Sequence, residues 1–548
     1  TLDDIRVIPA REVTANIELT PAGVRLQDYV VTAPYVEGSI ASTLEAQRET
    51  SSVVDVLGAE QMAATGDSDA AEALQRVSGL TIESGKFVLV RGQPSRYTLT
   101  LWNGSPLPSP EPLVRTIPLD LFPTGVLSGI EVQKSFTADR LASFGSGLVN
   151  LQTRGVPDET FFAITGSGGY NSESTFTQGL SYDGGSLDIF GFDDGTRALP
   201  DEVQEVLDSG EAELPRDTEV LQGFGRTFSN NYAQTQVTQP PDFGLTLTGG
   251  SSIEIFGDGR LGAVASAKWG TSWREQERIQ NSYEEFDDED GVRRVLLRDE
   301  FVDERTDFNA DIGTLLTVQA QWDKHEIASN TFFAHQTQQR TELRTGFTST
   351  SQRGDLRSFL LSWIERRLLA QQIMGFSDLD FLRIDYRGMI ATAGRDAPDR
   401  RRYEYFDTEP ADGTFVVFGN TGMERQYDTV EDTVLSFGLD VTVPIVDPED
   451  FWLGLEAKAG TAGFFQDRAT IRRVYRWRPD DENGADIGET NPEILYDPAN
   501  SGTTLIFGDF STRRQDDSVG LLDVLSGYGL VDARLGDLFR IVGGVRYE

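Results

Sequence analysis

Segments of about ten residues with alternating apolar and polar positions recur over most of the chain. Examples are TFFAITGSGGY, from Thr160, and LGAVASAKWGTSW, from Leu261. Short turns and long, charged, glycine-rich loops, such as Asp194 to Leu221, separate them. Alternation of this length, with aromatic residues at segment ends, is typical of strands that face lipid on one side and a polar lumen on the other. The pattern predicts on the order of 12 to 14 strands of about ten residues each between Phe161 and Glu548.

A mixed pattern of strand and helix signals precedes these segments, beginning at Ser51. A valine-rich strand leads into a short helix that Asp67 or Ser68 can cap. Gly79 can end this helix in left-handed geometry. The stretch therefore predicts a small α+β unit ahead of the strand-rich region.

Two turn signals punctuate this α+β unit. Gly92 permits a sharp departure from the strand-like run KFVLVR, Lys86 to Arg91. Asn103-Gly104 is the strongest short hairpin signal that a sequence offers. The stretch PLPSPEP that follows lacks four backbone N–H groups, so it cannot be a central strand.

Several motifs in this unit together point to one family. The runs KFVLVRG, LWNG, PLDLFP, IEVQK and FGSGLVNLQT follow each other over about 75 residues. In this order they resemble the plug domain of TonB-dependent outer-membrane receptors. The framework positions of the resemblance are Gly92, Asn103, Gly104, Gly145 and Gly147. The chain departs from the family pattern at Gln93-Pro94-Ser95, which puts in doubt only what that loop contacts.

The resemblance implies a mostly β fold, in which an α+β plug lies in the lumen of a 22-stranded antiparallel transmembrane β-barrel. Because fewer strands can be counted here, we expect the C-terminal part of the barrel to be missing from this sequence. We expect residues 1–27 to be the end of a carboxypeptidase-regulatory-like β-sandwich and residues 28–50 a TonB-box and linker segment. Residues 51–157 would be the plug domain, and residues 158–548 the incomplete barrel.

The resemblance also suggests residues for coupling and locking. The extended run Tyr29-Val30-Val31-Thr32-Ala33 is the TonB-box candidate, because an unpaired strand can be captured by edge pairing; the alternative is a linker strand without a partner. Arg91 and Lys134 occupy the positions of family basic residues that pair with barrel glutamates and lock the plug. The alternative for both is a solvated basic residue in a polar interior.

Composition excludes several kinds of chemistry. The chain has 48 basic and 88 acidic residues, a formal net charge of −40, which disfavours a nucleic-acid partner. There is no cysteine, so cysteine metal sites are excluded. The sequence contains no apolar run of about 18 residues, so it predicts no transmembrane helix. His325 and His335 lie too far apart on one strand to share a metal.

Three further stretches carry charge without a defined site. The acidic run Asp287 to Gly291 lacks the ligand spacing of a calcium loop. GFDDGTRALP, Gly191 to Pro200, and DAPDRRRYEY, Asp396 to Tyr405, resemble markers of one proteobacterial branch of these receptors. No pattern of catalytic residues is present, so we expect neither an enzyme nor a cofactor.

The resemblance implies an outer-membrane receptor of a Gram-negative bacterium that takes up an external ligand when an inner-membrane TonB-type motor moves the plug. Its partners would be that motor, outer-membrane lipid and lipopolysaccharide, and a small or polymeric ligand, with an oligosaccharide or peptide favoured over a siderophore. One alternative is a barrel that anchors surface proteins and transports little. Another is a soluble β-rich adhesin.

Overall fold

A computed structural model describes most of the chain after its N-terminal segment. The chain divides into two compact units, residues 1–36 and 37–548, and every described residue belongs to the second. The TonB-box candidate, 29–33, and the predicted end of a sandwich, 1–27, lie outside the described residues. The described residues are 39, 42–44, 47, 50, 52–112, 114–157, 159–209, 214–255, 257–287, 290–349, 355–409, 414–417, 422–446, 453–479, 491–510, 517–536 and 539–548.

The first part of the described chain forms a small α+β domain, here called the plug. Its central sheet has the order β1-β6-β7-β4-β5, and a two-stranded sheet, β2-β3, lies beside it. All neighbours in the central sheet are antiparallel except β4 and β7. The elements are β1 Val54–Gly58, α2 Ala59–Thr65, α3 Ala70–Leu74, β2 Leu80–Glu83, β3 Phe87–Val90, η1 Ser95–Tyr97, β4 Thr98–Trp102, β5 Ser105–Pro106, η2 Leu119–Leu121, η3 Thr124–Val126, β6 Leu127–Gln133 and β7 Gly147–Thr153.

The start of helix α3 in the plug is set by a capping side chain. Asp69 caps α3 by accepting a hydrogen bond from the backbone N–H of Glu72 at 3.0 Å. The predicted cap at Asp67 or Ser68 is therefore one to two residues early, because Asp69 is the residue with extended backbone directly before the helix. Gly79 has left-handed geometry, with φ of 76°, but it does not end the helix as predicted, because α3 already ends at Leu74 with Gln75 as its C-cap.

The hairpin predicted at Asn103-Gly104 joins β4 to β5. Both residues have positive φ, 45° and 79°, which is the geometry of the tight turn that matches strand twist. Leu101 pairs with Pro106 and Trp102 with Ser105, after which the proline-rich stretch leaves the sheet.

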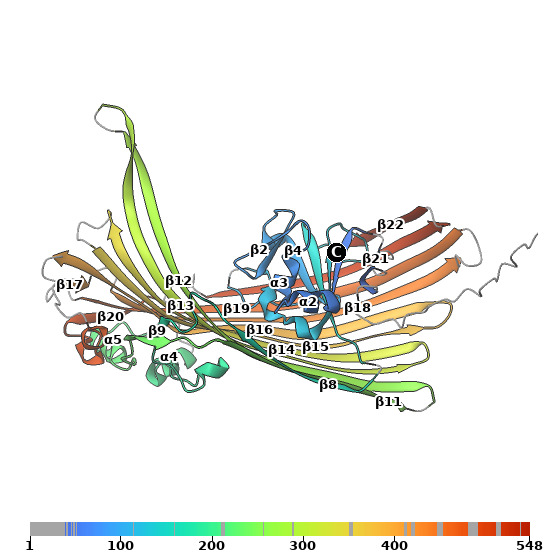
Figure 1. The fold of residues 1–548 in the computed structure, drawn as a ribbon, viewed down its shortest axis with the longest axis horizontal. Coiled ribbons are helices and arrows are strands. Elements are labelled where there is room, and N and C mark those ends of the chain that lie inside the picture. Colours follow the sequence, from blue (N-terminus) through green and yellow to red (C-terminus); the bar gives the residue numbers. More distant parts are fainter. Residues whose placement is uncertain are drawn as a thin grey trace, which may run out of the picture. The chain divides into compact units, whose positions relative to one another are not determined.

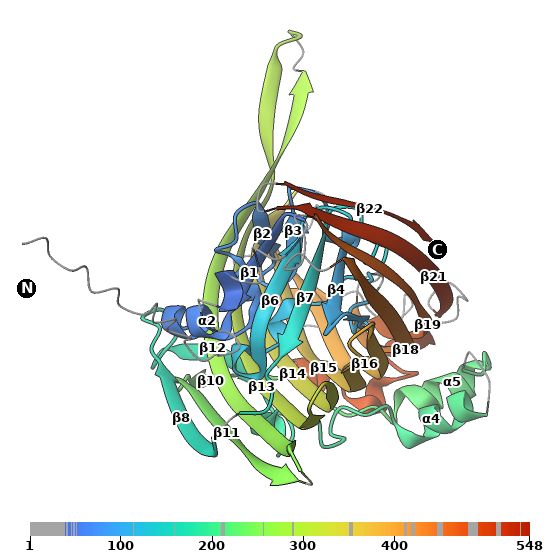
Figure 2. The same cartoon turned by 90° about the vertical axis from the view of Figure 1, so that its right-hand side faces the viewer.

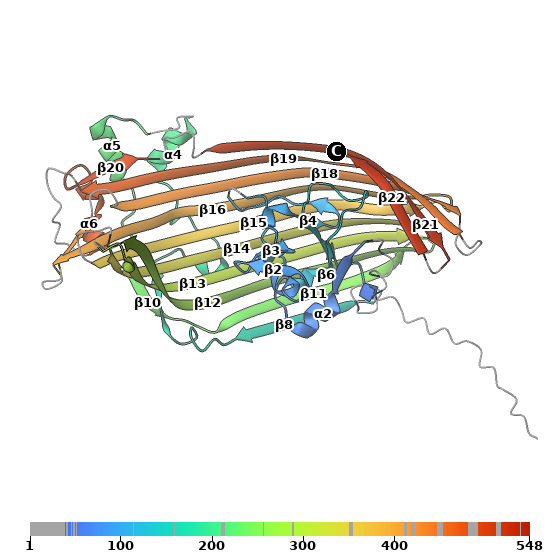
Figure 3. The ribbon, with the colours of Figure 1, turned by 90° about the horizontal axis from the view of Figure 1, so that it is seen from above.

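The second part of the chain includes one long antiparallel sheet of 13 strands with the main order β8-β11-β12-β13-β14-β15-β16-β18-β19-β21-β22, while β17 pairs with β16 and β20 with β19. Viewed from above, these strands run side by side (Figure 3). They are β8 Phe161–Gly169, β11 Asp242–Ile255, β12 Gly259–Asp287, β13 Arg293–Trp322, β14 His325–Thr348, β15 Asp355–Asp378, β16 Arg383–Glu409, β17 Thr414–Val417, β18 Met423–Val446, β19 Leu453–Pro479, β20 Leu505–Asp509, β21 Ser518–Leu535 and β22 Phe539–Tyr547.

Most strands of this sheet are longer than the predicted ten residues, although β8 and β22 have nine each. β12 has 29 residues and β13 has 30, because pairing continues well past the length that a bilayer requires. Periodicity alone did not show this length, because charged residues such as Glu284, Glu285 and Asp287 belong to the paired part of β12. The charged stretch Asp194 to Leu221 does lie in a connection, as predicted. Residues 282–298 are here called the β12–β13 ribbon. Within it, residues 283–287 pair with residues 293–297, and both runs lie beyond the Asp299–Thr348 rung that joins β13 to β14 (Figures 1 and 2).

The two ends of the sheet differ in their connections. At one end the turns are short, such as residues 323–324 between β13 and β14 and residues 379–382 between β15 and β16. At the other end β8 and β11 are joined by residues 170–241. In outer-membrane barrels short turns face the periplasm and long loops face outward, so we call these the short-turn end and the long-loop end.

The connections at the long-loop end carry their own elements. These are β9 Gln178–Tyr182, η4 Asp188–Phe190, α4 Asp201–Asp208, α5 Thr218–Gly225, β10 Gln234–Thr238, α6 Pro492–Leu495 and η5 Pro498–Asn500. β9 and β10 form a separate antiparallel pair. In the described part of the chain, no helix has both the length and the apolar character needed to cross a membrane.

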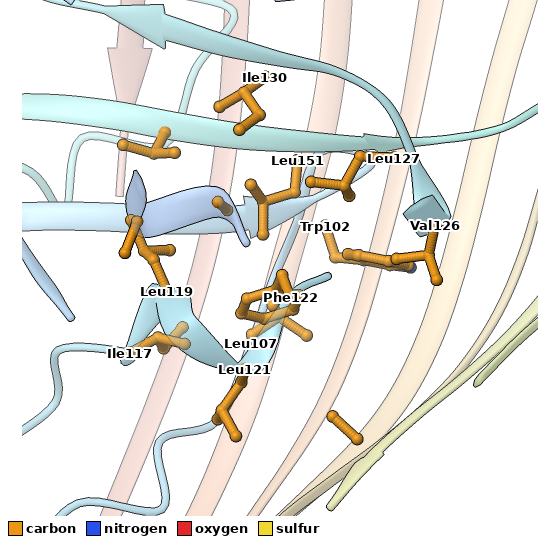
Figure 4. Close-up of a cluster of buried hydrophobic side chains, with 14 of the residues drawn as sticks. Trp102, Leu107, Ile117, Leu119, Leu121, Phe122, Val126, Leu127, Ile130 and Leu151 are labelled. Carbon is orange, nitrogen blue, oxygen red and sulfur yellow. The ribbon is translucent and has the colours of Figure 1, made fainter. Parts of the chain in front are cut away.

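The plug packs on the sheet through a shared apolar core. Trp102 and Phe122 of the plug lie 4.7 and 5.3 Å, between ring centroids, from Phe332 of β14. Figure 4 shows Trp102 and Phe122 among the buried plug side chains. Trp102, Phe122 and Phe332 are each fully buried. Residues of the 13-stranded sheet, here called the wall, such as Met389 of β16, belong to the same cluster. Burial of this kind fixes which face of the sheet the plug covers.

Candidate functional site

Arg366 of β15 holds two carboxylates of the plug. Its Nη1 donates to Glu111 and its Nη2 donates to Asp120, each over 3.1 Å. The three side chains are largely buried, with exposed fractions of 12, 12 and 17%. Charge-assisted hydrogen bonds in such surroundings are strong and directional, so Arg366 fixes the plug segment between residues 111 and 120 to the wall.

Glu111 has a second cationic partner on the plug itself. Lys86 Nζ lies 2.8 Å from Glu111 Oε1. Burial alone would raise the pKa of Glu111, but the attraction of Arg366 and Lys86 outweighs it, so the pKa lies below its usual value. Glu111 is therefore ionised at neutral pH and available to hold both cations.

The backbone beside Glu111 is held by two further wall residues. Asp432 of β18 accepts from the backbone N–H of Ser109 at 3.0 Å. Arg468 of β19 donates to the carbonyl oxygens of Ser109, at 3.2 Å, and of Glu111. Arg468 also pairs with Asp432 at 3.2 Å. Prolines prevent strand pairing in this plug segment, so wall side chains satisfy its backbone groups instead.

One wall side chain, the amide of Gln372, forms hydrogen bonds with the β4–β5 hairpin of the plug. Gln372 of β15, which is fully buried, accepts from Asn103 Nδ2 at 2.9 Å. Its own Nε2 donates to the carbonyl of Trp102 at 3.2 Å and to Ser105 Oγ at 3.0 Å. The turn that the sequence identified is thus also a docking point between the plug and the wall.

A cavity of about 1050 Å³ lies between the plug and the strands β8 and β11 to β16. Its lining includes polar side chains such as Asn309 and Gln338, together with thirteen charged residues. The charged residues are the cations Lys86, Lys268, Arg274, Arg305, Arg340, Arg366 and Arg395 and the acids Asp69, Glu72, Glu111, Asp120, Asp242 and Asp311. Seven cations against six acids is the reverse of the balance of the whole chain, which is strongly acidic.

Asp69, one of the acids that line the cavity, has a raised pKa. Burial raises the pKa of Asp69 to about 7, although its hydrogen bond from the Glu72 amide favours the charged form. The carboxyl that caps α3 is therefore close to half protonated at neutral pH.

The GFDDGTR stretch forms one boundary of this region. The carbonyl of Gly191 lies 2.6 Å from His335 Nε2, and the ring of Phe192 stacks on that of His335 at 4.2 Å. Gly191 has φ of 82°, and an added Cβ would meet Ala310 at 3.1 Å. Glycine is required there both by conformation and by the close approach to the wall.

Arg197 of the same stretch organises its charges. It is almost fully buried, pairs with Asp188 at 2.6 Å and Asp193 at 2.9 Å, and lies over the Trp363 ring at 4.1 Å. The Asp193 backbone N–H donates to Glu365 at 2.7 Å. The motif that the sequence marked without a role is therefore a folded element anchored on β14 and β15.

The DAPDRRR stretch supplies a buried ion cluster at the long-loop end. Asp399, in β16 with φ of 53°, accepts from Arg401 Nε at 2.8 Å and from Arg425 of β18. Arg425 Nη1 donates to the carbonyl of Ser229 at 2.7 Å, and Arg401 Nη1 donates to that of Asn231. Asp399 thus orients two arginines that hold the loop between β8 and β11.

The two predicted latch residues, Arg91 and Lys134, take no part in the contacts between plug and wall described above. Lys134 pairs with Asp55 and donates to the carbonyl of Ser78, both within the plug. Arg91 is exposed, has φ of 54° and, among the described residues, forms no ion pair. The adjoining Gly92 has φ of 73°, the left-handed geometry expected for a sharp departure.

The remaining predicted framework positions, Gly145 and Gly147, allow close packing. A Cβ at Gly147 would lie 2.9 Å from both γ-carbons of Val90, whereas at Gly145 it would make ordinary contact with Tyr97 at 3.5 Å. Gly147 therefore brings β7 directly onto β3.

Sequence reasoning did not single out Glu111, Asp120, Arg366 or Asp432. The available signal was an acidic residue inside a proline-rich plug segment, where backbone groups need outside partners. His325 and His335 both lie on β14, as expected for one strand. Within the described ranges, no three His, Asp or Glu side chains gather in a group able to hold a metal ion.

Comparison with known proteins found a family model that matches the plug and solved structures that are similar to the chain. Residues 46–149 match the family model of the TonB-dependent receptor plug domain. The structure is similar to the ferric citrate transporter FecA in its unliganded form, at 12% identity over 92% of this chain and 64% of that chain, with a TM-score of 0.39. It is also similar to the ferric yersiniabactin uptake receptor FyuA from Yersinia pestis, at 11% identity over 90% and 64%, with a TM-score of 0.39.

A third similar structure is the copper transporter OprC, at 10% identity over 94% of this chain and 80% of that chain, with a TM-score of 0.28. The chain spans 64% of the length of the first two of these proteins. No curated protein matches the sequence. Residues 46–149 of this chain are therefore a plug domain of the TonB-dependent receptor type, and this domain packs on a long antiparallel sheet.

Proposed function

We propose that the protein is a receptor that binds an external ligand in the cavity beside the plug and admits it when the plug moves. The observation that carries this proposal is the contact of Arg366 with Glu111 and Asp120. These three residues line the cavity and also hold the plug to the wall. A ligand in the cavity therefore touches the contacts that must break for a path to open.

The energy for this movement would come from a TonB-type motor of the inner membrane. The extended run Tyr29 to Ala33 is the proposed point of capture, because a free strand offers backbone N–H and C=O groups for edge pairing. Pulling on this run would transmit force to the plug that begins at residue 51. Outer-membrane lipid and lipopolysaccharide would surround the outer face of the sheet.

Arg91 and Lys134 keep their proposed roles as latch residues in a moving plug. Lys134 already has a plug partner in Asp55, so it would have to exchange that partner for a wall carboxylate. Arg91 is exposed and can reach a new partner without first breaking an ion pair that involves the described residues. Ion pairs that exchange with water suit a latch that opens and closes.

We propose an oligosaccharide or a peptide as the ligand, in preference to a siderophore. The cavity lining supports this choice, since amide side chains such as Asn309, Gln336 and Gln338 can donate to and accept from hydroxyl or peptide groups. A volume of about 1050 Å³ has room for more than a single sugar ring or amino acid.

The test begins by purifying the protein from its outer membrane and identifying bound small molecules by mass spectrometry. Uptake of the identified molecule is then measured in cells that carry the intact chain or a chain lacking Tyr29 to Ala33. A matched control deletes five residues from the exposed β12–β13 ribbon. We expect energised uptake to fail only in the first deletion; unchanged uptake there would reject the proposal.

The same purification distinguishes the anchoring role. A surface protein that purifies in stoichiometric amount, with no bound small molecule and no uptake, would favour a barrel that anchors an assembly. Extraction without detergent would instead favour a soluble adhesin and contradict both membrane roles.

A further inference from the structure

Arg366 and Arg395 lie directly opposite each other on neighbouring antiparallel strands, β15 and β16. Both side chains are 12% exposed, and both line the cavity. Like charges at directly opposed positions of a sheet repel each other, and water screens this repulsion only weakly when the groups are largely buried. A pair of this kind requires nearby anions.

The anions present serve the two arginines unequally. Arg366 has two carboxylate partners at 3.1 Å, Glu111 and Asp120. Arg395 lies 3.9 Å from Asp428 of β18, beyond hydrogen-bond distance, and its buried Nη1 has no hydrogen-bond partner in the described part of the chain. A buried guanidinium N–H without an acceptor is costly, so this position favours an additional anion.

The charge count at this point of the cavity leads to the same conclusion. Asp428 near Arg395 is already paired with Arg472 at 3.0 Å. With that pair included, the cations Lys86, Arg366, Arg395 and Arg472 face the acids Glu111, Asp120 and Asp428, which leaves one positive charge in excess. Asp120 Oδ1 is itself buried without a hydrogen-bond donor among the described residues. The cluster can therefore rearrange when another anion enters, because Asp120 is held by only one of its two oxygens.

We propose that Arg395 and Arg366 form a subsite for an anionic group of the ligand, a carboxylate or a phosphate. The proposal rests on the proposed function and specifies its ligand as an acidic oligosaccharide or a peptide with a free carboxylate, or a phosphorylated form of either. The anion binds Arg395 first and then competes with Glu111 and Asp120 for Arg366. Binding of the ligand thereby weakens the contact that holds the plug to the wall.

Linkage makes this competition measurable without a known ligand. Calorimetric titration of the full chain in detergent at low salt uses three probes: succinate, inorganic phosphate and the uncharged diamide succinamide. The variants are Arg395→Gln, Arg395→Lys and Glu111→Gln. The control is Arg402→Gln, which removes one exposed guanidinium from the same strand.

We expect succinate or phosphate to bind and succinamide not to bind, and the tighter anion identifies the group. Arg395→Gln should weaken anion binding at least about ten-fold, Arg395→Lys less, and Arg402→Gln should leave it unchanged. Glu111→Gln should tighten binding, because it removes a competitor for Arg366. Thermal unfolding of each variant establishes that it is folded.

Three results would overturn the subsite: no anion binding by the wild type, equal binding by folded Arg395→Gln, or an equal loss in Arg402→Gln. Unchanged or weaker binding in Glu111→Gln would overturn the competition. Uptake that depends on Tyr29 to Ala33, together with unaltered anion binding in Arg395→Gln, would reject the subsite and leave transport standing. If anion binding depends on Arg395 but uptake does not depend on Tyr29 to Ala33, the subsite stands and motor-driven transport is rejected.

Discussion

Arg366 donates to Glu111 across 3.1 Å, which places the cation on the wall and the carboxylate on the plug. The sequence resemblance implied the opposite polarity, with plug cations at Arg91 and Lys134 meeting wall glutamates. The two arrangements are compatible, because they use different plug segments, and the second still awaits a test. The observed contact is the one that also borders the cavity.

Replacing Arg366 should loosen one defined part of the plug. Arg366→Gln leaves Asp120 without its cation and Glu111 with Lys86 alone, and loss of one partner from a largely buried pair costs about 3 kcal/mol or more. Hydrogen exchange of residues 109–122, followed by mass spectrometry, should speed up markedly.

The matched control for that experiment is Arg367→Gln. Arg367 is the next residue on β15, points to the other face, is half exposed and pairs with Asp396. Equal acceleration in both variants would show that the effect is a general loss of strand stability, not the release of a latch.

Local features of this fold could be predicted from sequence, and long-range ones could not. The Asn103-Gly104 turn and the bend at Gly92 follow from backbone conformations that few residues adopt. The partner of Glu111 lies 255 residues away, and pairing at that distance depends on a strand register that no local pattern encodes. For the same reason the sequence marks the GFDDGTR and DAPDRRR stretches without indicating their structural role.

Asp69→Asn should stabilise helix α3 at high pH. The folded carboxyl has a pKa of about 7, above its unfolded value near 4, so the wild type loses stability as pH rises from about 4 to about 7. Asparagine caps a helix as well as aspartate but carries no charge. The gap between variant and wild type should widen across that window and then stay constant at no more than about 4 kcal/mol, because each pKa unit corresponds to about 1.4 kcal/mol.

Amide exchange of α3, compared between the two proteins at each pH, measures that gap because the intrinsic exchange rate cancels. Asp69→Ser, which also places an uncharged cap at this position, should show the same widening gap. A constant difference across the whole pH range would contradict a raised pKa at Asp69.

Asp399→Ala should release the loop at the long-loop end. The change leaves Arg401 and Arg425 as buried cations without their shared carboxylate, which costs about 3–5 kcal/mol. Limited proteolysis between residues 214 and 233 should accelerate while cleavage in the plug stays unchanged. Asp385→Ala, which removes a more exposed carboxylate from the same strand, should resemble the wild type.

Gly147→Ala should separate β7 from β3. The new methyl group would lie 2.9 Å from Val90, and overpacking of this kind costs about 1–3 kcal/mol. Exchange of plug amides should therefore increase. If the clash is the cause, Val90→Ala in the same chain should recover part of the loss, so that the two effects are not additive. Gly166→Ala, where a Cβ meets nothing within 4 Å, provides a neutral comparison.

The length of β13 has a consequence for what the cell surface presents. Thirty residues at about 3.3 Å each give roughly 100 Å of strand, against a hydrocarbon layer of about 30 Å. Even at a tilt of about 45°, much of the strand stands in water. Antibodies and phage tail fibres arriving from outside should thus meet residues 282–298 before they meet the lipid. We expect sequence variation between strains to be concentrated in that ribbon, because substitutions there do not change the side chains that line the lumen.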